Sequence, residues 1–112
     1  MVSKAPTPSD MTKAERAHKD AVAALGCVAC MKLHGCTTYA VELHHLRTGG
    51  WGKGSYLTLM PLCYTHHHSP QFGVHGMGTK AFDRYYGDVE RFGDRAFTQR
   101  DLLEYTLEKV NA

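Results

Sequence analysis

The segment Val41-Glu42-Leu43-His44-His45-Leu46-Arg47 places two adjacent histidines at the end of a stretch in which apolar and polar residues alternate. Such alternation is typical of a β-strand. Adjacent residues of a strand point to opposite faces, so His44 can bind a metal ion while His45 accepts a proton beside it. Histidine titrates near neutral pH, which suits both tasks. The segment therefore predicts a strand that ends in a reactive site.

Pairs of metal-binding residues flank this strand on both sides. Cys27-x2-Cys30 precedes it, and Cys63-x2-His66 follows it. Zinc prefers four tetrahedral ligands, and each pair supplies two of them at a suitable separation. The sequence therefore predicts a structural zinc site at Cys27, Cys30, Cys63 and His66. Four unrelated cysteines in a small core are the alternative, and Cys36 is expected to remain a thiol outside the site.

Three further histidines follow the second pair, namely His67, His68 and His75. If His66 binds zinc, His67 can turn toward His44, and His75 can complete a face of three histidines. Three protein ligands with open positions are typical of a catalytic metal ion. We therefore expect a second ion at His44, His67 and His75. A run of solvated histidines, or zinc ligation by His67 or His68 in place of His66, is the alternative.

Size and composition suit one small metal-supported domain. The chain has 112 residues and a formal net charge of +2, which neither establishes nor opposes binding to nucleic acid. No run of about 18 apolar residues occurs, so we expect no membrane span. Residues 1–10 do not resemble a signal peptide. We therefore expect a cytoplasmic protein whose reduced cysteines bind metal rather than form disulfides.

Local signals divide the chain into a flexible tail at residues 1–10 and a single domain at residues 11–112. Thr12-x-x-Glu15 and Thr98-x-x-Asp101 predict the starts of two helices. The expected elements are a helix at 12–25, a tight turn at 27–30, a strand at 37–46, a glycine-rich loop at 48–55, a strand at 56–62, a short helix at 63–68, a loop that carries His75, a helix at 79–86 and a helix at 98–110. These elements predict an α+β fold.

The order of the motifs resembles the HNH, or ββα-metal, nucleases over roughly residues 27–75. HHLRTGG at 44–50, MPLCYTHH at 60–67, GVHG at 73–76 and KAFDRYYG at 80–87 most resemble the Ref-like, RecA-dependent recombination-enhancement nucleases of phages and prophages. The resemblance implies a zinc-stabilised, treble-clef-like HNH domain with flanking N- and C-terminal helices. It implies a metal-dependent DNA endonuclease that acts in recombination in the bacterial host cell, with DNA and a RecA-type filament as partners and no membrane.

The resemblance also implies roles for individual residues. His44, His67 and His75 match the ligands of the catalytic ion, expected to be Mg²⁺ with Mn²⁺ or Zn²⁺ as alternatives, and His45 matches the general base. The four residues predicted for structural Zn²⁺ match the zinc ligands of the family. The middle asparagine of the pattern is missing, because the only asparagine of the chain is Asn111. Thr58 occupies its place, and a hydroxyl there can pin the loop in part.

The phosphate contacts and the function each have a second interpretation. Arg47 and Lys53 flank the glycine-rich loop and are candidate phosphate contacts, with solvated loop charges as the alternative. A non-catalytic zinc module that binds DNA or a recombinase filament is the second functional hypothesis. Such a module has no use for a histidine beside a metal-bound one, so His45 favours the enzyme.

Overall fold

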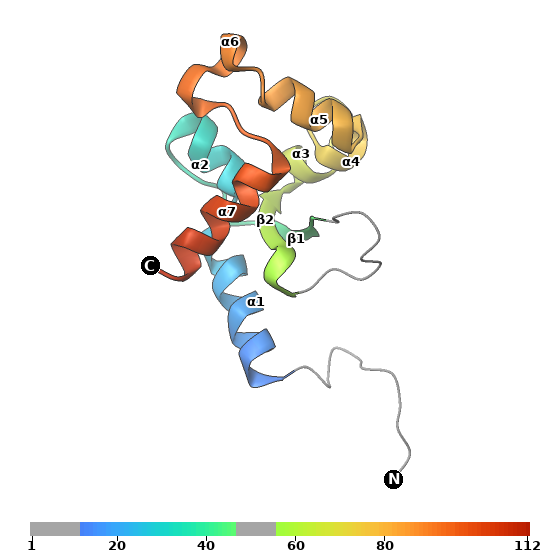
Figure 1. Cartoon of the computed structure of the whole chain (residues 1–112). Coiled ribbons are helices and arrows are strands. Elements are labelled where there is room, and N and C mark those ends of the chain that lie inside the picture. Colours follow the sequence, from blue (N-terminus) through green and yellow to red (C-terminus); the bar gives the residue numbers. More distant parts are fainter. Residues whose placement is uncertain (1–11, 47–55) are drawn as a thin grey trace.

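The computed structural model describes residues 12–46 and 56–112, which form a small α+β fold around two antiparallel strands (Figure 1). The expected tail at residues 1–10 and the glycine-rich loop lie outside the described residues. The elements in chain order are α1 (Lys13–Leu25), α2 (Val28–His34), β1 (Val41–His45), the 3₁₀ turn η2 (Tyr56–Thr58), β2 (Leu59–Cys63), α3 (Tyr64–His67), α4 (Val74–Met77), α5 (Thr79–Tyr86), α6 (Val89–Phe92), the 3₁₀ turn η3 (Gly93–Arg95) and α7 (Gln99–Val110).

Both predicted helix starts are confirmed. Thr12 and Glu15 cap α1 reciprocally, and Thr98 and Asp101 cap α7 in the same way. In each case the side chains satisfy backbone N–H groups that the first helical turn leaves without a partner. Val22 is the only buried residue of α1.

Strand β2 occupies the centre of the core, and all five of its residues are buried. It pairs with β1 so that His44 lies opposite Met60 and His45 opposite Leu59. Helices from both ends of the chain, α1 and α7, contact β2 and cover the hairpin (Figure 1). The end of β1 that carries His44 and His45 is therefore paired with a fully buried strand.

An aromatic cluster positions the second half of the chain. The rings of Tyr86 and Phe97 stack with centroids 4.9 Å apart, and Phe82 packs against Tyr86 at 4.6 Å. The Tyr86 hydroxyl donates to the carbonyl of Phe72 at 2.9 Å. This cluster ties α5 to the segment that enters α7 and to the loop that precedes α4.

The segment around the first cysteine pair differs from its prediction. The expected tight turn at residues 27–30 is wrong, because Cys27 instead caps the helix α2 and its sulfur accepts from the N–H of Cys30 at 3.4 Å. The first strand begins at Val41 and not at Thr37. Thr38 accepts from the N–H of Cys27 at 2.9 Å, and Thr37 donates to the Cys27 carbonyl at 2.8 Å. These two residues therefore hold the cysteine segment instead of extending the strand.

One further boundary and two further segments also differ. The predicted second strand starts at Leu59, since Tyr56–Thr58 form a 3₁₀ turn. The loop expected around His75 contains the short helix α4, and α6 and η3 fill a region without a predicted element.

Within the described residues, no helix has the length and apolar character needed to cross a bilayer.

Candidate functional site

Three buried cysteines and a buried histidine converge where α2, β2 and α3 meet. Nδ1 of His66 lies 3.7, 3.6 and 3.3 Å from the sulfurs of Cys27, Cys30 and Cys63. The sulfurs of Cys30 and Cys63 are 3.9 Å apart. The structure therefore brings together the four residues that the sequence selects as zinc ligands, and it places His66 rather than His67 or His68 among the cysteines.

These separations fit a tetrahedral metal ion. Zinc bonds of about 2.3 Å to sulfur and about 2.0 Å to nitrogen place the ligand atoms roughly 3.5–3.8 Å apart. The observed sulfur–nitrogen and sulfur–sulfur separations of 3.3–3.9 Å bracket this range. The four side chains can therefore hold a metal such as zinc with small shifts of their own.

Burial favours the neutral forms of three side chains in this cluster, Cys27, Cys30 and His66. Burial raises the pKa of the Cys27 thiol to about 12 and also raises the pKa of Cys30. Burial lowers the pKa of the His66 ring. The protein matrix alone therefore keeps these side chains neutral, and a divalent cation is the group that stabilises thiolates in such a setting.

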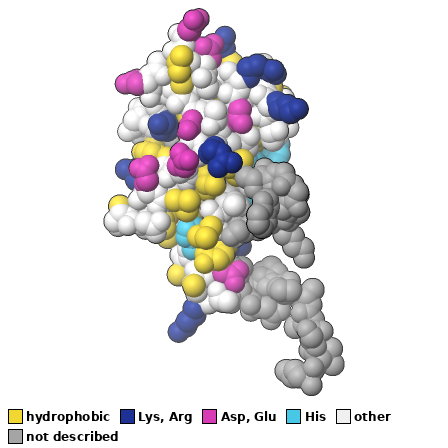
Figure 2. All heavy atoms as spheres, in the orientation of Figure 1, with side chains coloured by type: hydrophobic (Ala, Val, Ile, Leu, Met, Phe, Trp, Pro, Cys, Tyr) yellow, Lys and Arg dark blue, Asp and Glu magenta, His cyan; other side chains and the backbone are white. Residues whose placement is uncertain are grey.

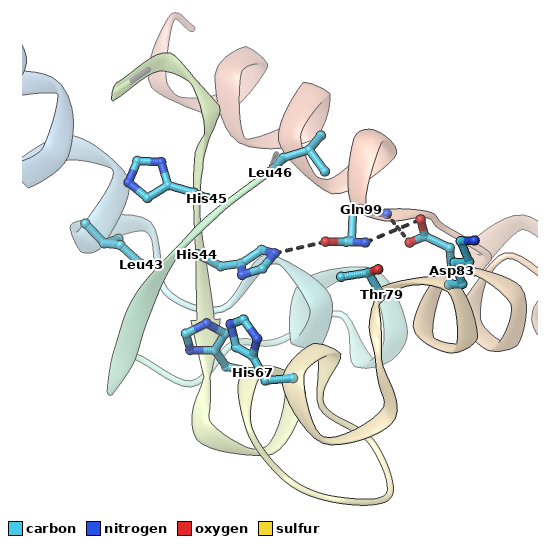
Figure 3. A pocket seen from close by; sticks show the side chains of 10 residues that line it. Leu43, His44, His45, Leu46, His67, Thr79, Asp83 and Gln99 are labelled. Carbon is cyan, nitrogen blue, oxygen red and sulfur yellow. Dashed lines mark hydrogen bonds between the residues drawn. The ribbon is translucent and has the colours of Figure 1, made fainter. Parts of the chain in front are cut away.

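A second cluster consists of His44, His67 and His75, which come from β1, α3 and α4. Figure 3 labels His44 and His67. Each ring offers one nitrogen, and the three nitrogens lie within 4.8 Å of one another. The ring centroid of His44 is 5.2 Å from that of His67 and 5.2 Å from that of His75, and the rings of His67 and His75 are 4.7 Å apart. The arrangement can hold a metal ion on one face and leave the opposite face to solvent.

Glycine makes the approach of His75 possible. A Cβ on Gly76, the next residue, would overlap the carbonyl of Ser69 and the backbone of Pro70. The backbone of α4 can therefore pack against the segment after α3 only with glycine at this position. This close packing brings His75 to His67.

Burial favours the metal-binding form of two of these histidines, His44 and His75. Burial lowers the pKa of His44 to about 4, and the neighbouring His67 and His75 act in the same direction. Burial also lowers the pKa of His75. Both rings are therefore neutral at neutral pH, and neutral imidazole is the form that coordinates a metal ion.

Glu42 supports the cluster from the same face of β1. Its Oε1 lies 2.8 Å from Nδ1 of His67 and 3.3 Å from Nε2 of His68. The hydrogen bond from His67 is the main reason that the pKa of Glu42 is lowered. A carboxylate can only accept, so Nδ1 of His67 carries the proton and its Nε2 keeps the lone pair. Carboxylates that orient metal-binding histidines in this way are common partners of metal sites.

A chain of hydrogen bonds runs from His44 to Gln99 and on to Asp83 (Figure 3). Oε1 of Gln99 is 2.9 Å from Nε2 of His44. The Asp83 carboxylate accepts from the backbone N–H of Gln99 at 2.8 Å and from its side-chain Nε2 at 3.4 Å. The first residue of α7 is thus tied both to α5 and to the end of β1.

His45 projects from the face of β1 opposite to His44, as the strand alternation predicts (Figure 3). Its ring is exposed, whereas His44 is only 5 % exposed. Nδ1 of His45 lies 3.3 Å from the hydroxyl of Thr58, and the backbone carbonyl of Thr58 accepts from the N–H of Leu46 at 2.9 Å. Thr58 therefore contacts both the histidine and the end of the strand.

An open pocket of about 640 Å³ lies over the histidine cluster. His44, His45, His67 and His75 all line it, together with Thr79 and Lys80 from the first turn of α5. Lys80 supplies a positive charge to this lining, and no local signal in the sequence marks it as a site residue. On the face shown in Figure 2, basic and acidic side chains are interspersed, so the charge there is mixed.

The remaining candidates fall elsewhere. Arg47 and Lys53, the expected phosphate contacts, lie outside the described residues. Cys36 is exposed and belongs to neither cluster. His34 is exposed, and the ring of His18 is half-buried with its centroid 5.4 Å from that of Tyr56.

Comparison with known families places these features in context. Residues 11–111 match the family model described as recombination enhancement, RecA-dependent nuclease. No curated protein matches the chain. The family match spans both clusters and the helix α7 that carries Gln99.

Proposed function

The chain belongs to the recombination enhancement, RecA-dependent nuclease family, and from this premise we propose that it is a metal-dependent DNA endonuclease of the HNH type that acts in DNA recombination. The observation that carries the proposal is the separation of two ligand clusters, one of cysteines and one of histidines. The first has the composition of a structural site. The histidine cluster opens into a pocket that His45 also lines.

The first part of the proposal is a structural zinc ion at Cys27, Cys30, Cys63 and His66. The ligand separations and the raised thiol pKa values support it. Such an ion would join α2 to the junction of β2 and α3. It would therefore hold the hairpin and the histidine-bearing helix in a treble-clef-like arrangement, which a chain of this size needs because its apolar core is small.

The second part is a divalent ion at His44, His67 and His75. When bound, it would supply positive charge to a non-bridging oxygen and to the leaving oxygen of the phosphodiester. Three imidazole nitrogens suit Mn²⁺ or Zn²⁺ better than Mg²⁺, which prefers oxygen ligands. On donor chemistry we therefore place Mn²⁺ and Zn²⁺ ahead of the Mg²⁺ expected from the resemblance.

The third part assigns the proton transfer to His45. Its ring lines the same pocket as the cluster and lies on the opposite face of β1 from His44. The Thr58 hydroxyl near Nδ1 orients the ring, so Nε2 is the nitrogen proposed to take a proton from the attacking water. Thr58 would thus take over part of the role of the asparagine that the HNH pattern has at this position.

Lys80 is the proposed phosphate contact among the described residues. It lines the pocket from α5, and its ammonium group would bind the negatively charged backbone next to the histidines. Arg47 and Lys53 stay in the proposal as further phosphate contacts from the glycine-rich loop.

The rival function is a non-catalytic zinc module that binds DNA or a recombinase filament. Both functions need the cysteine cluster, so that cluster does not separate them. The pocket with a second ligand cluster and His45 favours the enzyme. A binding module would keep its DNA affinity and show no cleavage with any divalent ion.

The deciding experiment compares cleavage of a supercoiled plasmid with cleavage of a RecA-formed displacement loop of the same sequence, each with Mn²⁺, Zn²⁺, Mg²⁺ or chelator. We expect weak metal-dependent nicking of the naked plasmid and stronger cutting of the displacement loop. His44→Ala should be inactive on both, and Cys36→Ser should match the wild type. Equal rates on both substrates would remove the recombination role, and no cleavage under any condition would favour the binding module.

A further inference from the structure

The orientation of the Gln99 side chain is fixed by Asp83. The Asp83 carboxylate accepts from the backbone N–H of Gln99 through Oδ1 and from its side-chain Nε2 through Oδ2, at 2.8 and 3.4 Å. A carboxylate cannot donate, so the NH₂ group of Gln99 must face Asp83. Its Oε1 must therefore face His44, and the side chain is only 4 % exposed.

The orientation of Gln99 in turn fixes the protonation of His44. Oε1 of Gln99 lies 2.9 Å from Nε2 of His44, and an amide oxygen only accepts. Nε2 of His44 must therefore carry the ring proton. A neutral imidazole has one N–H, so the lone pair of His44 lies on Nδ1.

We propose that Asp83 and Gln99 are positioning residues that hold His44 in its Nε2–H tautomer and so select Nδ1 as its metal-binding atom. His67 shows the reverse pattern, because Glu42 accepts from its Nδ1 and leaves Nε2 for the ion. The two histidines therefore present opposite nitrogens to one cluster. The assignment of Nδ1 to an ion rests on the proposed function, whereas the tautomer does not.

The same hydrogen bonds explain why α7 begins at the site. Gln99 is the first residue of α7, and its backbone N–H is one of the groups that a helix start leaves without an intrahelical partner. Asp83 satisfies this group and the side chain together. The C-terminal helix is therefore placed by the carboxylate that orients the histidine.

The substitution Asp83→Asn tests the proposal, because it should move the ring proton of His44 from Nε2 to Nδ1. Its Oδ1 must still accept from the backbone N–H of Gln99, so its NH₂ group takes the place of Oδ2. The Gln99 side chain must then turn its oxygen toward Asn and its NH₂ toward His44. His44 can accept that hydrogen bond only through an unprotonated Nε2, so its proton should move to Nδ1.

The combined variant Asp83→Asn/Gln99→Glu should restore the original tautomer. The new carboxylate accepts from the amide on one oxygen and from Nε2–H of His44 on the other. Gln99→Met removes the two side-chain hydrogen bonds of Gln99, to His44 and to Asp83, at similar side-chain length. The matched control is Asp94→Asn, at an exposed position of η3.

The measurement is the ring nitrogen spectrum of His44 in the full chain at pH 7.5, in buffer without added divalent ions. Burial, which lowers the pKa of His44 to about 4, keeps the ring neutral there. Long-range proton–nitrogen correlations should show Nε2–H in the wild type, Nδ1–H in Asp83→Asn and Nε2–H again in the combined variant. Mn²⁺ or Zn²⁺ affinity should fall about 10–100-fold in Asp83→Asn and recover with the tautomer.

Two results would overturn the proposal. One is a wild-type His44 with its proton on Nδ1 or shared between the nitrogens. The other is an unchanged Nε2–H tautomer of His44 in Asp83→Asn. Neither result depends on cleavage, so a failed nuclease assay leaves this test intact.

Discussion

The carboxylate of Glu42 accepts a hydrogen bond from Nδ1 of His67 at 2.8 Å, across the gap between β1 and α3. Glu42 lies two residues before His44 on the same face of the strand, so one strand contributes both a proposed ligand and the partner of another. This contact fixes which nitrogen of His67 points into the cluster.

Glu42→Ala should weaken the binding of a divalent ion at the histidine cluster about 10–100-fold, because His67 then loses the acceptor that orients it. Isothermal titration with Mn²⁺ or Zn²⁺ measures this change, with the tightly held zinc left in place. Glu104→Ala, at an exposed position of α7, is the control of equal charge change. An unchanged affinity in Glu42→Ala would show that the carboxylate does not support the site.

The cysteine cluster should hold one zinc ion per chain far more tightly than the histidines hold theirs. Cys27→Ser and Cys63→Ser should lose that ion and unfold, because a structural zinc site contributes an apparent free energy on the order of 10 kcal/mol. Elemental analysis and circular dichroism melts check both results. Cys36→Ser should behave as the wild type, since Cys36 is exposed and outside the cluster. A zinc-free Cys63→Ser protein with a native melt would contradict the structural role.

The sequence predicts those parts of the molecule whose signals are local. Each of these signals spans only a few residues. They are the capping boxes before α1 and α7, the alternation of His44 and His45, and the two cysteine-bearing pairs, and the structure agrees with each. Even the partner Glu42 was within reach of the sequence, because strand alternation places it on the face of His44.

The sequence could not predict contacts between distant segments. Gln99 is 55 residues from His44, and its hydrogen bond depends on how the aromatic cluster around Tyr86 and Phe97 places α7. The start of β1 was missed for a related reason. Thr37 and Thr38 have strand-like residues around them, but their hydrogen bonds go to Cys27 instead.

His45→Ala should lower the cleavage rate about 10²–10⁴-fold while zinc content, melting temperature and DNA affinity stay near the wild type. A general base acts in the transition state, and its loss leaves substrate binding largely unchanged. His67→Ala should also lose cleavage, but through loss of the second ion. His34→Ala, at an exposed position of α2, is the control. Wild-type cleavage by the His45 variant would place the base elsewhere.

Stability should depend on pH through His44. Its folded pKa is lowered to about 4 by burial, whereas an unfolded histidine titrates near 6.5. Above pH 6.5 both states are neutral and the full stability is present; as the pH falls toward 4, only the unfolded state gains a proton. The free energy of unfolding should therefore fall by up to about 1.4 kcal/mol per pH unit in this window.

Urea denaturation at pH 7.5, 6.5 and 5.5 tests this dependence by comparing the wild type with His44→Gln. Acid also weakens zinc binding to cysteines, and that effect is common to both proteins. The wild type should thus lose more stability than the variant over the same interval. Parallel pH profiles would show that His44 does not carry the shift.

Lys80→Ala should weaken DNA binding and raise KM with little change in kcat, because the lysine lines the pocket but is not one of the proposed metal ligands. A phosphate contact also contributes to the salt dependence of binding, and its loss should reduce the slope of log K against log salt by about 1. Fluorescence anisotropy with a duplex oligonucleotide at several salt concentrations measures this slope. Lys109→Ala removes the same charge near the far end of α7, about 15 Å along the helix from Gln99, and should change the slope little. Equal slopes for the Lys80 variant and the wild type would remove Lys80 from the DNA path and leave phosphate binding to Arg47 and Lys53.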